Sequence, residues 1–139
     1  MEAVLLIGIQ GSGKTTFYRE RFADTHAHIS LDVLKTRGRE RDALYGCLRN
    51  RQPFVIDNTN VRAAERAVYI AAAKQAGFRV VGYFFDVPLR EALRRNARRE
   101  GAGKIPPVGV VGTFKRQERP DVAEGFDELH VVTPEAASQ

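Results

Sequence analysis

Short hydrophobic runs and amphipathic stretches alternate along the whole chain. Five runs rich in β-branched and aromatic residues predict strands at about residues 3–7, 28–31, 53–56, 79–85 and 129–132. Between them, hydrophobic side chains recur every three or four positions and predict helices at about 14–22, 39–50, 61–76 and 88–100, with a weaker one ending near 117. This alternation is typical of an α/β fold, a parallel sheet of about five strands with helices on both faces.

Individual residues suggest where several of these helices begin and end. Asn60 is expected to cap the helix 61–76, and Gly77 to end it. Pro88 suits the first position of the helix that follows the fourth strand.

Composition and length indicate one globular domain. The 139 residues are expected to form a single domain, and 43% hydrophobic with 28% charged residues is ordinary for a soluble protein. No hydrophobic stretch approaches the ~18 residues that cross a membrane, and no targeting segment is recognised. The single cysteine, Cys47, excludes an internal disulfide and favours a cytoplasmic location. Oligomeric state is left open.

The positive charge is concentrated in one segment. Between residues 88 and 120, nine basic and three acidic side chains give a net charge of +6, while the rest of the chain carries −1. Such a patch attracts polyphosphates, which include ATP and nucleic acid.

Residues 8–15 read GIQGSGKT, directly after the first predicted strand. This is the phosphate-binding loop of nucleoside triphosphatases and kinases, whose backbone N–H groups surround an anion. Lys14 is expected to reach the β- and γ-phosphates, and the Thr15 hydroxyl to bind Mg²⁺. The expected nucleotide-binding residues are Gly8, Gly11, Ser12, Gly13, Lys14, Thr15 and Thr16. ATP and Mg²⁺ are therefore the expected ligands.

Two aspartates follow predicted strands, where ligands of parallel sheets bind. Asp32, after the second strand, is the candidate that accepts the proton of an acceptor hydroxyl, or else it caps a short helix. Asp57, at the end of the third strand, either holds Mg²⁺ or serves the turn formed with residues 58–60.

Arginines dominate the helix predicted at 88–100. Arg95 and Arg99 lie one turn apart, as do Arg90, Arg94 and Arg98, and only Glu91 and Glu100 offset them. Such a helix either forms a lid over the ATP phosphates, at about residues 88–107, or is a solvated basic face. Gly101 and Gly103 would let a lid move.

Other candidate residues carry a weaker signal. Arg37, Arg39 and Arg41 either contact an anionic acceptor or are solvated. The three histidines, His26, His28 and His130, show no metal-ligand spacing and are expected to be structural.

The chain resembles the kinase domain of the polynucleotide 5′-hydroxyl kinases. The likeness rests on the phosphate loop, on HISLD at 28–32, on IDNTN at 56–60, and on RNARR at 95–99 followed by KIP at 104–106. It implies a P-loop NTPase/kinase fold and ATP-dependent transfer to the 5′-hydroxyl of DNA or RNA.

The same resemblance implies roles for single residues. Asp32 matches the general base, Asp57 an active-site acid, and Arg95 and Arg99 the lid arginines on the phosphates. Lys35 falls where some members have an arginine that touches the acceptor nucleotide. The expected acceptor-binding residues are Asp32, Lys35, Asp57 and Asn60.

Departures from the family pattern are also visible. Ser30 and Leu31 stand where the family usually has an asparagine-like residue and an arginine. No D-x-D-x-T signature occurs, so the 3′-phosphatase domain often fused in this family is not expected in this sequence.

Two other functions stay open from the sequence. A P-loop kinase of a small metabolite or nucleoside would use the same residues with a closed acceptor pocket. A non-catalytic ATP-binding module is the third candidate, although neither an N-K-x-D guanine motif nor an Asp-Glu pair after a strand is present.

Overall fold

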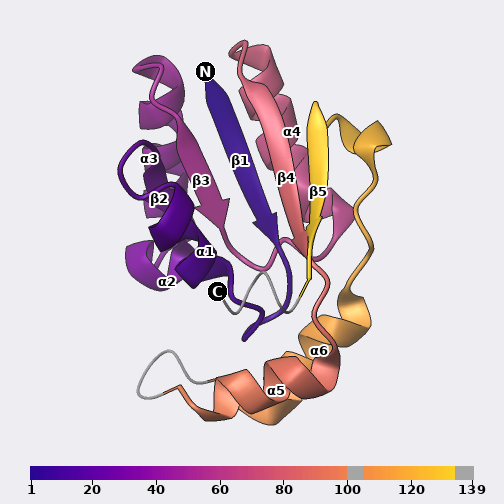
Figure 1. Ribbon diagram of the computed structural model, residues 1–139. Helices are drawn as coiled ribbons and strands as arrows, with labels where there is room; N and C mark the ends of the chain where they lie inside the picture. The colour runs from indigo at the N-terminus through magenta and orange to yellow at the C-terminus, as the bar shows by residue number, and fades with distance from the viewer. Residues whose placement is uncertain (100–104, 134–139) are drawn as a thin grey trace.

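A computed structural model describes residues 1–99 and 105–133 of the chain. Its strands are β1 (Glu2–Ile7), β2 (Ala27–Ile29), β3 (Phe54–Asp57), β4 (Arg79–Phe85) and β5 (Glu128–Val132). They form one parallel sheet in the order β2-β3-β1-β4-β5 (Figure 1). The predicted five-stranded parallel sheet is confirmed.

Helices connect consecutive strands. They are α1 (Lys14–Arg21), α2 (Leu31–Leu34), α3 (Arg37–Arg49), α4 (Ala63–Gln75), α5 (Leu89–Ala97), α6 (Pro107–Arg116) and the short 3₁₀ helix η2 (Val122–Glu124). In Figure 1, α5 and α6 lie beyond the carboxyl ends of the strands, the edge where parallel sheets bind ligands.

The central strand β1 explains the uninterrupted hydrophobic run near the start of the chain. Leu5 pairs with Ile56 of β3 on one side and with Gly82 of β4 on the other. Residues 3–7 are fully buried. A strand covered on both faces needs hydrophobic side chains at every position rather than at alternate ones.

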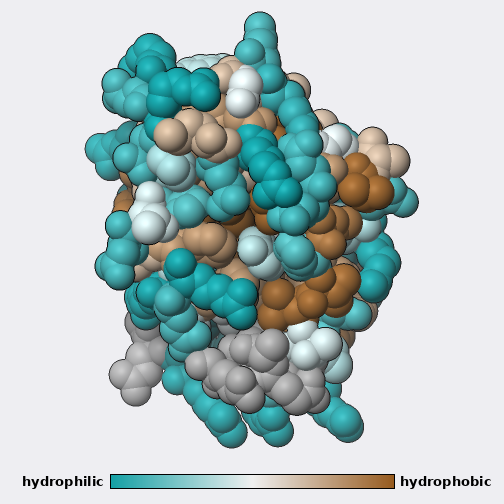
Figure 2. All heavy atoms as spheres, turned by 45° about the horizontal axis from the view of Figure 1, so that its top comes forward, coloured by the Kyte–Doolittle hydropathy of each residue, from teal (hydrophilic) through white to brown (hydrophobic). Residues whose placement is uncertain are grey.

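Two hydrophobic cores lie on opposite faces of the sheet. Because side chains alternate along a strand, Val4 and Leu6 pack with α1, α5 and α6, while Leu5 and Ile7 pack with α3 and α4. The prediction of helices on both faces is confirmed. Charged and polar side chains cover much of the face in Figure 2, with hydrophobic patches between them. In the described part of the chain, no helix is both long and apolar enough to span a membrane.

The segment after β2 differs from its prediction. β2 ends at Ile29, and residues 31–34 form the four-residue helix α2, whose N-cap is Ser30 in an extended conformation. Asp32 therefore lies in the first turn of α2, and its interpretation as the cap is wrong. A four-residue helix is too short to show a helical period in the sequence.

The start of α4 also differs, because Asn60 does not cap it. The N-cap is Arg62. Asn60 instead has a positive φ of 50°, and its side-chain amide donates to the Leu6 carbonyl oxygen at 2.9 Å. Asparagine tolerates this left-handed conformation, which turns the chain away from β3. Pro88 is likewise the residue before α5 rather than its first residue.

Candidate active site

The phosphate-binding loop joins β1 to α1 and needs glycine for two physical reasons. Gly11 and Gly13 have φ values of 80° and 96°, which other residues rarely adopt. A Cβ atom on Gly11 would also lie 2.4 Å from the Ala92 carbonyl oxygen of α5. The loop is therefore in direct contact with the arginine-rich helix. Ser12 is buried and Thr16 is exposed in the first turn of α1.

Lys14 is buried and folds back over its own loop. Its ammonium group donates to the carbonyl oxygens of Gly8 at 2.7 Å and Ile9 at 3.0 Å. Burial lowers the pKa of Lys14 to about 8, against the opposing attraction of Asp57 and Asp32. A triphosphate placed in the loop would supply the negative charge that a buried ammonium group requires.

Thr15 and Asp57, the two residues predicted to bind Mg²⁺, are in contact. The Thr15 hydroxyl donates to Asp57 Oδ2 at 2.9 Å, and the Asp57 side chain is only 4% exposed. Burial opposes ionisation of Asp57, yet hydrogen bonds from His28 and Thr15 and the charge of Lys14 hold its pKa below the usual range. A hydroxyl next to an ionised carboxylate suits Mg²⁺, which takes few protein oxygens and completes its shell with phosphate and water.

His28 contacts the site residue Asp57, a contact that the sequence did not reveal. Its Nε2 lies 2.8 Å from Asp57 Oδ2, and its ring stacks on Tyr18 with centroids 4.2 Å apart. These contacts agree with a structural histidine, and they also hold the Asp57 carboxylate in place. The contact follows from the parallel pairing of β2 with β3, in which His28 is opposite Val55.

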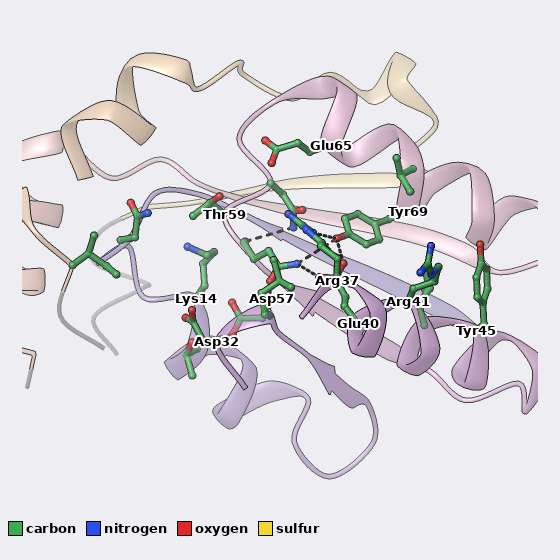
Figure 3. Close-up of a pocket in the computed structure, with 18 of the residues that line it drawn as sticks. Lys14, Asp32, Arg37, Glu40, Arg41, Tyr45, Asp57, Thr59, Glu65 and Tyr69 are labelled. Carbon is green, nitrogen blue, oxygen red and sulfur yellow. Dashed lines mark hydrogen bonds and ion pairs between the residues drawn. The ribbon is translucent and has the colours of Figure 1, made fainter. Parts of the chain in front are cut away.

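Asp32 lies on α2 near Lys14, as Figure 3 shows. It is exposed and lines the same cavity as Lys14 and Thr15. Across residues 1–99 and 105–133, no group donates a hydrogen bond to its carboxylate. A carboxylate with this freedom can accept a proton from a ligand hydroxyl.

The arginine-rich helix is better compensated than its sequence suggests. Glu91, one of the two acids expected to offset the arginines, accepts hydrogen bonds from Arg94 and, at 3.3 Å, from Arg95 Nε. Arg99, just beyond α5, lines the cavity with Lys14. The predicted hinge glycines, Gly101 and Gly103, lie outside the described residues, as does Lys104.

Asn96 fixes the geometry of this helix. Its buried side chain accepts a hydrogen bond from Ile105 N at 3.0 Å and donates another to Ile105 O. The backbone on the two sides of residues 100–104 is thereby held together. Helix α5, held near its carboxyl end by these bonds, approaches the phosphate loop at Gly11 through Ala92 and Asn96.

Four polar side chains form what we term the Glu40 network, in which Arg37, Asn58 and Tyr69 all bond to Glu40. Glu40 Oε2 accepts from Asn58 Nδ2 at 2.7 Å, and Oε1 accepts from the Tyr69 hydroxyl at 2.9 Å and from Arg37 at 3.0 Å. Burial and the hydrogen bond to Glu40 raise the pKa of Tyr69 to about 12, so it stays a donor. Asn58 Oδ1 in turn accepts from Leu31 N at 2.9 Å, which links the network to α2.

One cavity of about 540 Å³ joins these groups. At its phosphate end it is lined by Lys14, Thr15, Asp32, Asp57, Asn60 and Arg99. Beyond Asp57, between α3 and α4, it is lined by Arg37, Arg41, Tyr45, Glu65, Val68 and Tyr69. Figure 3 shows Arg41 and Tyr45 farthest from Lys14. We call the second part the α3–α4 groove.

Two of the predicted basic residues do not reach the cavity. Lys35 is exposed with a φ of 77°, and neither it nor Arg39 lines the cavity. Arg37 and Arg41, one helical turn apart on α3, do line it. No sequence motif marks Glu40 or Tyr69, because the hydrogen bond between them joins residues 29 positions apart in the chain.

Comparisons with known proteins find relatives of this chain in sequence and in structure. A family model described as AAA domain matches residues 36–120. A bifunctional polynucleotide phosphatase/kinase of Schizosaccharomyces pombe is 26% identical over 94% of this chain. The aligned part is 33% of that relative, so the chain spans about a third of its length.

Solved structures extend the likeness at low identity. Chaetomium thermophilum Kti12, in complex with ADP-AlF₃, matches 94% of this chain and 88% of its own with a TM-score of 0.70 and 19% identity. A sugar kinase from Janibacter matches 99% of this chain and 90% of its own with a TM-score of 0.66 and 17% identity. The APS kinase CysC of Mycobacterium tuberculosis, in complex with AMPPNP and APS, matches 99% and 93% with a TM-score of 0.61 and 20% identity. These neighbours show the P-loop NTPase fold.

Proposed function

The chain belongs to the AAA domain family, and we propose that it is an ATP-dependent kinase that transfers the γ-phosphate to a hydroxyl group. One observation carries this proposal. A single cavity brings Lys14 of the phosphate loop together with Asp32, the candidate base, and with Arg99, which follows α5. A nucleotide-binding module without transfer activity would not need a carboxylate in the cavity beside the phosphate-binding lysine.

The proposed reaction assigns one task to each group. The loop and Lys14 hold the β- and γ-phosphates, and Arg99 balances charge that develops on the transferred group. Asp32 accepts the proton of the acceptor hydroxyl as its oxygen bonds to the γ-phosphorus, and the bond to the β–γ bridging oxygen breaks to release ADP. Mg²⁺, held by Thr15 and Asp57, would neutralise phosphate charge.

The acceptor we propose is the 5′-hydroxyl end of DNA or RNA. Three observations support it: the likeness to the S. pombe polynucleotide phosphatase/kinase, the basic excess at residues 88–120, and a cavity that extends past Asp32. A small hydroxyl-bearing acceptor is the second candidate, since the fold is shared with a sugar kinase and with an APS kinase.

A transfer assay decides between these acceptors. Purified protein is given γ-labelled ATP and Mg²⁺ with 5′-hydroxyl DNA or RNA oligonucleotides, nucleosides, sugars or APS in separate reactions. We expect label on the oligonucleotides. Label on a nucleoside, a sugar or APS alone would establish the small-molecule function instead.

The role of Asp32 is tested in the same assay. Asp32→Asn keeps the size of the side chain and should lower kcat by about 10²–10⁴-fold, with the KM for ATP little changed. Asp42→Asn, an exposed α3 residue that does not line the cavity, is the matched control. Full activity of Asp32→Asn would remove the general base from the proposal.

A further inference from the structure

The α3–α4 groove contains groups that phosphate transfer itself does not use. Arg37, Arg41 and Tyr45 follow one another at intervals of four residues, so they share one face of α3, and all three line the cavity. From Arg37 to Tyr45 the helix advances about 12 Å. Figure 3 shows Arg41 and Tyr45 at the end of the cavity that is remote from Lys14 and Asp32.

Arg41 is the cation of the groove that stays available to a ligand. Arg37 is bonded to Glu40 and Tyr69. Arg41 is exposed, and within the described residues it makes no hydrogen bond or ion pair. Both oxygens of Glu40 accept bonds within the Glu40 network, and Glu65 Oε1 accepts from Arg62 N at 3.1 Å. Glu40 is thus already paired with Arg37, and within the described residues neither Glu40 nor Glu65 forms an ion pair with Arg41. The guanidinium group of Arg41 can therefore attract an anion.

Beside this cation, the groove presents exposed hydrophobic surface from both of its walls. Tyr45 of α3 is 47% exposed and Val68 of α4 is 64% exposed, and both line the cavity. Ligand pockets are lined mainly by hydrophobic and aromatic side chains with a few polar groups, and the groove has this composition. An aromatic ring next to a guanidinium group matches the base and phosphate of a nucleotide.

We propose that the α3–α4 groove binds the first nucleotides of a single-stranded 5′ end. Tyr45 stacks on a base, with Val68 opposite, and Arg41 binds a phosphate that follows the reacting nucleoside. This inference rests on the proposed polynucleotide kinase function and names the part of the protein that recognises the polymer. Because Tyr45 and Val68 are exposed, the remaining nucleotides of the nucleic acid can extend from the groove into solvent. A small acceptor would instead need polar groups that enclose it.

The test uses the full chain and four variants. KM and kcat are measured for a 5′-hydroxyl oligonucleotide of eight nucleotides, and KM is measured for ATP. We expect Arg41→Ala and Tyr45→Ala each to raise the oligonucleotide KM by about tenfold, as the loss of one phosphate or stacking contact predicts. The KM for ATP should stay the same. Tyr45→Phe keeps the ring and should behave as wild type.

The matched charge control is Arg39→Ala, on the same helix but outside the cavity lining. It should leave the oligonucleotide KM within twofold of wild type. The salt dependence adds an independent readout, because Arg41→Ala should reduce the slope of log affinity against log salt by about 0.7 for a single strand.

The possible failures can be told apart. If wild type phosphorylates the oligonucleotide while Arg41→Ala and Tyr45→Ala match Arg39→Ala, the groove assignment is wrong and the kinase function stands. If wild type neither binds a labelled oligonucleotide nor phosphorylates it, both proposals are overturned.

Discussion

At the scale of one residue, Lys14 occupies a position that favours a negatively charged ligand. Its ammonium group is buried among carbonyl oxygens, which offer hydrogen bonds but no full negative charge. Burial therefore lowers the pKa of Lys14 from 10.5 to about 8. Phosphate oxygens would supply the missing charge and shift the equilibrium back to the protonated form.

We predict that ATP binding takes up a proton above pH 8. The free protein has lost part of the Lys14 proton there, so the affinity for ATP should fall as pH rises, approaching tenfold per pH unit. Calorimetric titration at pH 8.5 in buffers of different ionisation enthalpy measures the proton uptake. Lys14→Arg stays protonated and should bind without uptake. An affinity for ATP that stays constant between pH 7.5 and 9.5 would contradict this account.

The same pKa has a consequence for stability without ligand. Between pH 8 and 10.5 the unfolded chain keeps a Lys14 proton that the folded chain has lost. The unfolded state then binds more protons, so the Lys14 contribution to the free energy of unfolding rises with pH across this window.

At the scale of elements, α2 depends on its neighbours because four residues cannot form a stable helix alone. The hydrogen bond from Leu31 N to Asn58 Oδ1 anchors its start, and Asn58 is held in turn by Glu40 and Tyr69. Asp32 follows Leu31 directly. The Glu40 network thus determines where the candidate base lies, although only Arg37 and Asn58 were considered from the sequence.

Asn58→Ala should therefore impair catalysis more than nucleotide binding. It leaves Leu31 N without its acceptor, a cost of about 1–3 kcal/mol in the free energy of unfolding, and frees α2 to move. We expect kcat to fall at least tenfold with the KM for ATP within twofold. Asn50→Ala, at the exposed end of α3, is the matched control. Equal kcat values for the two variants would exclude this positioning role.

The sequence predicts best those elements in which burial or backbone conformation restricts the residue type at every position. The fully buried strand β1 and the glycines with positive φ leave few alternatives. Predictions fail where a polar side chain has several possible partners. Asn60 could cap a helix or bond to Leu6, and nothing in the sequence shows that His28 contacts Asp57. Which partner such a side chain contacts depends on the order and register of the strands, and these are properties of the whole sheet.

At the scale of the whole molecule, one buried ion pair joins the carboxyl-terminal part of the described chain to the site. Arg66 of α4 is fully buried and donates to both carboxylate oxygens of Glu124, at 2.8 and 3.0 Å. It also donates to the Asn60 carbonyl oxygen at 2.9 Å. The turn that follows β3 is thereby supported from the segment before β5.

Glu124→Gln should be strongly destabilising. It leaves the buried Arg66 charge without a carboxylate, which is expected to lower the free energy of unfolding by about 3–5 kcal/mol. Urea unfolding followed by circular dichroism measures the change. Glu128→Gln breaks the exposed pair with Arg79 and should have a far smaller effect. If both variants unfold at the same urea concentration, the buried pair contributes little.

The Arg66–Glu124 pair also has a consequence for the point during synthesis of the chain at which the site can form. A ribosome that has released the chain as far as Arg99 has already made every candidate residue of the phosphate site. Yet Arg66 cannot enter the core at low cost until Glu124 has emerged, some 25 residues later. Nascent chains should accordingly acquire nucleotide affinity abruptly, once residue 124 has emerged, instead of gradually as the phosphate loop and α5 appear.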